Sequence, residues 1–126
     1  DGGRRTNFLA VTSDYLPTVL DLIGMSYPDN RPLDGVSLLP AMKRNEAQRQ
    51  APIGFHFRTQ RAWITPRHKL YSSNGGRSWE LYDLVDDRDE SENLAESQPA
   101  VLERLKARYR QWARSVRRSQ TGADYH

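Results

Sequence analysis

The chain has 126 residues, with 19 Lys and Arg against 16 Asp and Glu, and its formal net charge is +3. It contains no Cys, which excludes a disulfide framework, a thiolate metal site and a cysteine nucleophile within these residues. No apolar run approaches the ~20 residues that a membrane span requires, and three Trp, six Tyr and three Phe argue against disorder.

The first predicted element is a helix over about residues 12–24. Thr12, Ser13 and Asp14 can cap its amides, and a broad run of apolar residues follows them. The segment up to Val36 is irregular, because two Pro and the pair Asp34-Gly35 supply turn chemistry. A short helix over about residues 37–43 comes next.

The second half predicts a sheet and a helix. Alternating apolar residues separated by tight turns predict four strands, over residues 53–58, 61–65, 68–72 and 79–84. A helix then begins at Ser97 or Gln98, and its apolar stripe is expected to pack on the sheet. The predicted class is α+β: a four-stranded antiparallel sheet packed by a C-terminal helix, with an apolar N-terminal helix that we expect to belong to the core of another domain.

Charge is unevenly distributed in this half. Residues 80–96 carry eight acidic side chains and one Arg, whereas residues 98–118 carry seven basic side chains and one Glu. Two interpretations stay open: neighbouring surfaces that compensate each other, or a helix that binds polyanions.

The sequence carries no recognisable active site. The His residues lack the spacing of zinc ligands, and the acidic residues 83–90 lack the order of an EF-hand loop. No Ser lies in a Gly-x-Ser-x-Gly elbow. We therefore assign no catalytic residue and no metal ligand.

Three segments together match a family pattern. Residues 11–24, with Asp14, Pro17 and Thr18, resemble the Asp-x-x-Pro-Thr-x-Leu-x-x-x-Gly helix of sulfatases. Residues 33–40 are similar to the Asp-Gly-x-Ser-Leu-Leu-Pro segment that follows that helix in the family. Residues 79–95 resemble the family's Glu-Leu-Tyr-Asp-Leu to Asn-Leu-Ala region, with Arg88 where Pro is usual. The chain thus resembles the C-terminal portion of a sulfatase, within the alkaline-phosphatase-related superfamily.

The resemblance implies a division of the chain and a role for it. Residues 1–50 would end the large catalytic α/β domain, residues 51–118 would form the small C-terminal subdomain, and residues 119–126 a tail. The chain begins with Asp1 and has no initiator Met or apolar leader, so we expect it to derive from a longer protein. That parent would hydrolyse sulfuric esters. This segment, inactive alone, would be a structural buttress and a rim of the substrate pocket.

Site residues, cofactors and partners follow from the same resemblance. His56, Arg58 and Arg61 are the expected substrate-binding residues, since Arg can pair bidentately with sulfate or carboxylate; the alternative is surface charges without a ligand. No cofactor is expected in this segment, but calcium and a formylglycine are expected in the parent. The expected partners are the missing catalytic domain and a sulfated small molecule or glycan, not nucleic acid or membrane.

Further expectations concern location and association. The resemblance implies a periplasmic or secreted parent. The apolar face of the first helix, without the large domain, would be prone to self-association.

Two alternative functions stay open at this point. One is a stand-alone module whose basic helix, residues 104–118, binds polyanions. The other is the tail of a related phosphonate or phosphate monoester hydrolase, which only the upstream nucleophile motif would distinguish from a sulfatase.

Overall fold

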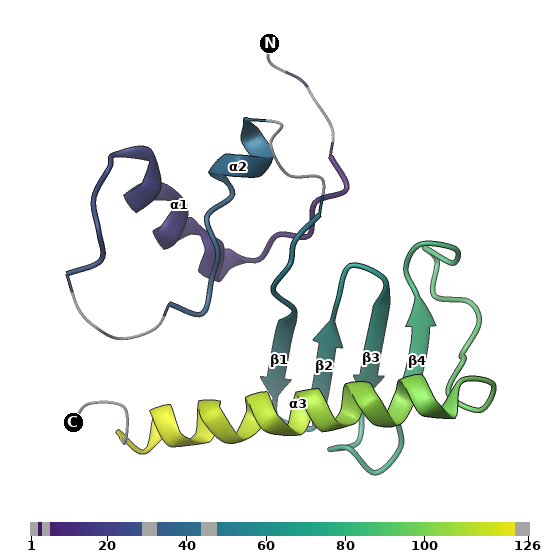
Figure 1. The fold of residues 1–126 in the computed structure, drawn as a ribbon. Coiled ribbons are helices and arrows are strands. Elements are labelled where there is room, and N and C mark those ends of the chain that lie inside the picture. Colours follow the sequence, from purple (N-terminus) through teal and green to yellow (C-terminus); the bar gives the residue numbers. More distant parts are fainter. Residues whose placement is uncertain (1–2, 4–5, 29–32, 44–47, 123–126) are drawn as a thin grey trace. The chain divides into compact units, whose positions relative to one another are not determined.

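The structure is a computed structural model that describes residues 3, 6–28, 33–43 and 48–122. It divides into two compact units, residues 1–51 and 52–126. The elements in chain order are η1 (Thr12–Asp14), α1 (Tyr15–Leu22), α2 (Leu39–Met42), β1 (Ile53–Phe57), β2 (Gln60–Ile64), β3 (His68–Ser72), β4 (Glu80–Asp83) and α3 (Pro99–Gln120) (Figure 1).

The predicted α+β class is confirmed. The four strands form an open antiparallel sheet in the order β1-β2-β3-β4, with one helical region before it and one long helix after it. Each strand lies within one residue of its predicted range at both ends.

Helix boundaries differ more from the prediction than strand boundaries do. The first predicted helix is a 3-10 turn followed by the eight residues of α1. The second predicted helix begins at Leu39, with Leu38 as its N-cap residue. The Ser37 hydroxyl, one residue before the N-cap, accepts the Leu39 amide at 3.2 Å. The helix α3 continues to Gln120, two residues into the predicted tail; residues 123–126 of that tail lie outside the described residues.

In the first unit, Gly35 allows two backbone segments to touch. A Cβ atom at this position would lie 2.0 Å from the carbonyl oxygen of Ser13, closer than any side chain could approach. The segment that follows Gly35 therefore lies directly against η1, and only glycine permits that approach.

In the second unit, α3 covers one face of the sheet and the core lies between them (Figure 1). Side chains alternate between the faces of each strand, so Trp63, Leu70 and Leu81 point toward α3 and are buried. They pack with Leu105 and Tyr109 of the helix.

The contact between α3 and β1 is close. A Cβ atom at Gly54 would lie 2.5 Å from the Trp112 ring, so the missing side chain makes room for the indole. Trp112 also stacks at a tilt on Trp63, with 5.8 Å between ring centroids. These contacts of Trp112 stabilise the helix on β1 and β2.

The helix α3 is longer than the sheet is wide. Its 22 residues span about 33 Å, whereas four strands span about 14 Å between the outer two. The helix begins beside β4, runs across the strands and ends beyond β1 (Figure 1). Its last turns therefore project past the sheet. None of the helices in the described residues has the length and hydropathy needed to cross a membrane.

Candidate functional site

The first unit contains a buried ion pair. Asp14 and Arg49 are 0% and 1% exposed, and Nη1 of Arg49 lies 2.6 Å from Oδ2 of Asp14. The same carboxylate accepts the backbone amides of Val11 and Val36, both at 2.9 Å. Asp14 thereby joins three segments of the chain that are distant in sequence.

Thr18, one helical turn after Asp14, adds a further link between α1 and the segment before α2. Its hydroxyl donates to the carbonyl of Asp14 at 2.6 Å and accepts the amide of Leu38 at 2.9 Å. Asp14 and Thr18 of the sulfatase-like helix pattern thus hold the segment that carries the second pattern. Since Asp14 is fully buried, this constellation is structural and does not reach a substrate.

Ionisation of Asp14 is favoured despite its burial. Desolvation acts to raise the pKa of this carboxyl, but the hydrogen bond from Arg49, the amides of Val36 and Val11 and the Arg49 charge outweigh it. The pKa of Asp14 therefore lies below its ordinary value. Arg49 also donates from Nε to the carbonyl of Ala51 at 2.7 Å, while its Nη2 has no partner among the described residues.

The three predicted substrate-binding residues lie together at one end of the β1–β2 hairpin. His56 pairs with Arg61 in the antiparallel register, and Arg58 lies in the connecting turn with a positive φ of 52°. Nη1 of Arg61 donates to the carbonyl of Gln60 at 2.9 Å and to that of Arg58. Arg58 is exposed, and its guanidinium carbon lies 5.3 Å from the Phe57 ring centroid.

One residue of α3, Tyr109, completes this end of the hairpin, and sequence reasoning did not assign it to the site. The Tyr109 hydroxyl lies 3.4 Å from Nδ1 of His56. Burial, with the positive charges of Arg61 and Arg117, lowers the pKa of His56, so its imidazole is neutral near pH 7.

The residues of this chain do not fit the two groups expected in a catalytic sulfatase, a formylglycine and a bound calcium ion. The chain has no Cys from which a formylglycine could be made. Within the described ranges there is also no group of three or more His, Cys, Asp or Glu side chains able to hold a metal ion. What the hairpin end can do chemically is bind an anion, through guanidinium groups and a neutral imidazole.

Comparison with known proteins identifies relatives of the chain. It is 30% identical over 93 residues to a Delta 4,5-hexuronate-2-O-sulfatase of Bacteroides thetaiotaomicron, a match that covers 67% of this chain and 19% of the relative. Its structure is similar to that of a 2-O GAG sulfatase, with a TM-score of 0.63, 26% identity and coverage of 86% of this chain and 26% of the other.

A further solved structure belongs to a different hydrolase. The phosphonate monoester hydrolase of Agrobacterium radiobacter matches with a TM-score of 0.53 and 27% identity, over 84% of this chain and 24% of the other. No protein-family model matches the chain. The chain spans about a fifth of the curated relative and about a quarter of the solved chains.

Proposed function

Because the chain is related to the sulfatases and to other hydrolases of the alkaline-phosphatase superfamily, we propose that it is the C-terminal segment of a sulfuric ester hydrolase. In that protein it supports the catalytic domain and contributes residues to the rim of the substrate pocket. The substrate of the whole protein is a sulfate ester on a glycan, as the names of the relatives suggest. Calcium and formylglycine belong to the catalytic domain.

The observation that carries the supporting role is the exposed apolar surface of α1 and the residues after it. Tyr15 and Leu22 are 67% and 65% exposed, and Leu16, Val19 and Ile23 are exposed as well. Soluble proteins seldom leave a contiguous patch of this kind uncovered unless another surface binds it. The catalytic domain of the longer protein is the proposed cover.

The second unit has a similar surface. Phe55 and Phe57 lie on the face of the sheet opposite α3, and Phe57 is 66% exposed. An open antiparallel sheet commonly turns a polar face to water, so exposed Phe residues on this face support burial against a further domain.

The rim role rests on the hairpin end. Arg58 has no ion-pair partner among the described residues, and its guanidinium is available to a sulfate or carboxylate. His56 supplies a neutral imidazole, and Arg61 has one nitrogen committed to the turn carbonyls. Arg58 is therefore the residue that we expect to bind substrate most directly.

The test of the proposal is the activity of the protein encoded by the full source gene. Assayed with calcium on an aryl sulfate and on a 2-O-sulfated unsaturated uronide, the long protein should release sulfate, and the 126-residue chain should release none. Turnover of a phosphonate monoester in place of the sulfate esters would favour the phosphonate hydrolase, the alternative that the second structural relative supports. A source gene that encodes only these residues, with a soluble monomeric product, would contradict the supporting role.

In an active long protein, Arg58→Ala should raise KM for the glycan sulfate about tenfold and leave kcat nearly unchanged. The substitution removes a charged hydrogen bond of about 1.5–3 kcal/mol. Because that bond would bind the substrate and the transition state equally, its loss raises KM and leaves kcat unchanged. Steady-state kinetics measure both constants. The matched control is Arg88→Ala, which removes an exposed Arg from the segment between β4 and α3. Equal effects of the two substitutions on KM would contradict a place for Arg58 at the rim.

A further inference from the structure

Four arginines form a line on the outer face of α3. Arg110, Arg114, Arg117 and Arg118 are spaced i, i+4, i+7 and i+8, the pattern that places side chains on one face of a helix. All four are exposed. They extend over about 12 Å of the helix axis, and we call them the arginine stripe.

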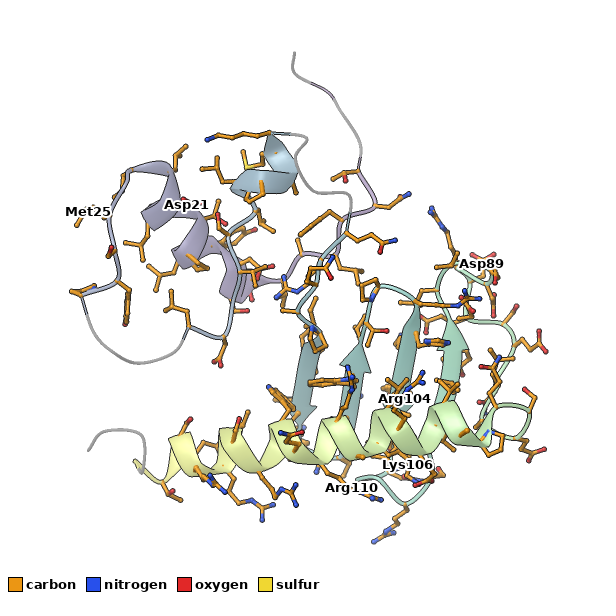
Figure 2. All side chains as sticks on the ribbon, viewed as in Figure 1. Asp21, Met25, Asp89, Arg104, Lys106 and Arg110 are labelled. Atoms are coloured by element: carbon orange, nitrogen blue, oxygen red, sulfur yellow. The ribbon has the colours of Figure 1, made fainter. Side chains whose placement is uncertain are left out.

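The arginine stripe forms no ion pair with a carboxylate within the described residues. None of the four lies within ion-pair distance of an Asp or Glu there. Glu103 is the only acidic residue of α3, and its carboxylate already binds Nζ of Lys106 at 2.5 Å. Lys106 and Arg110 both lie along the lower edge of α3 in Figure 2.

The acidic segment of the sequence does not compensate for the arginine stripe. Within the second unit Asp89 lies at the end of β4 that is away from α3 (Figure 2). Two of the acidic side chains, Asp83 and Asp86, pair with Arg67, and Glu90 pairs with Lys69. The arginine stripe lies in the C-terminal half of the helix, so its charge faces solvent.

The helix dipole explains only part of this arrangement. Basic residues in a last turn interact favourably with the carbonyl end of a helix, and Arg117 and Arg118 occupy the last turn. Arg114 and Arg110 lie before that turn, where the dipole has little effect. Since the end of α3 projects beyond β1 (Figure 1), this charged face is accessible along the helix as well as at its end.

We propose that the arginine stripe is a binding surface for a sulfated polysaccharide. The inference rests on the proposed function, which supplies the choice of ligand. A row of guanidinium groups suits a polyanion with anionic groups repeated along its length, because each fork can pair with one such group. Held there, a sulfated chain would stay attached to the enzyme between successive hydrolysis events.

The test uses the 126-residue chain and heparin as the probe, by isothermal titration over a range of salt concentrations. The quadruple variant R110Q/R114Q/R117Q/R118Q should bind heparin at least tenfold more weakly near physiological salt. The slope of log K against log salt should also fall by about 3, since each ionic contact contributes nearly one unit for a polyanion. Gln is a good helix former, so α3 should keep its circular dichroism.

A matched control distinguishes binding by the arginine stripe from a general effect of the net charge of the chain. The variant R77Q/R88Q/R104Q/R108Q lowers the net charge by the same four units from +3 and should keep heparin affinity within about twofold. Equal losses in the two variants would overturn the proposal, as would unchanged binding by the stripe variant. Equal affinity for desulfated heparin or for duplex DNA would overturn the choice of a sulfated polysaccharide. None of these outcomes depends on sulfatase turnover, so the proposed function is tested separately.

Discussion

Replacing Asp14 by alanine is expected to destabilise the first unit by about 3–5 kcal/mol, enough to remove its ordered structure. The substitution leaves the buried Arg49 without its carboxylate and frees the amides of Val11 and Val36. Hydrogen exchange of those two amides, followed by NMR, measures the loss directly. The three Trp all lie in the second unit, and their fluorescence serves as an internal reference.

Two controls accompany this variant. Asp34→Ala removes an exposed carboxylate of the same unit and should change stability by no more than about 0.5 kcal/mol. D14L/R49M removes both charges and should recover much of the loss, because no unpaired charge stays buried.

The pH dependence provides a third comparison. Folding lowers the pKa of Asp14, so its contribution is present above the ordinary value of 3.8 and is lost as pH falls through the lower pKa of the folded state. The D14A variant should lack that component of the acid transition. An Asp14→Ala chain with unchanged exchange rates would contradict the role of this ion pair.

Replacing Leu81 by alanine is expected to destabilise the second unit by about 2–5 kcal/mol. Leu81 is 0% exposed and packs in the core formed by β2, β3 and α3, where truncation leaves a cavity. Denaturant unfolding followed by Trp fluorescence measures the change, because Trp63, Trp79 and Trp112 line or contact this core.

The matched control for Leu81 is Val85→Ala, which shortens a side chain just after β4 that is 54% exposed. We expect a change of at most about 0.5 kcal/mol. If both substitutions lowered stability equally, the core assignment of Leu81 would be wrong.

Structural contacts explain why the sulfatase-like sequence patterns are recognisable in a segment that has no assigned catalytic group. The amide of Leu81 donates to Oδ1 of Asn93 at 3.0 Å, and the amide of Leu94 donates to the carbonyl of Leu81 at 2.7 Å. Asp14, Thr18 and Gly35 make comparable contacts in the first unit. The residues of each pattern therefore connect segments that are distant in the sequence.

By itself, the sequence determined the order and type of the elements. Period-two alternation specified the four strands, and the stripe from Val101 to Val116 specified the helix that packs on them, because these signals are local. Only the tertiary structure decided that Asp14 meets Arg49, that Tyr109 reaches His56 and that α3 ends beyond β1. Such contacts join residues far apart in the chain, and their geometry depends on how whole elements pack rather than on any local pattern.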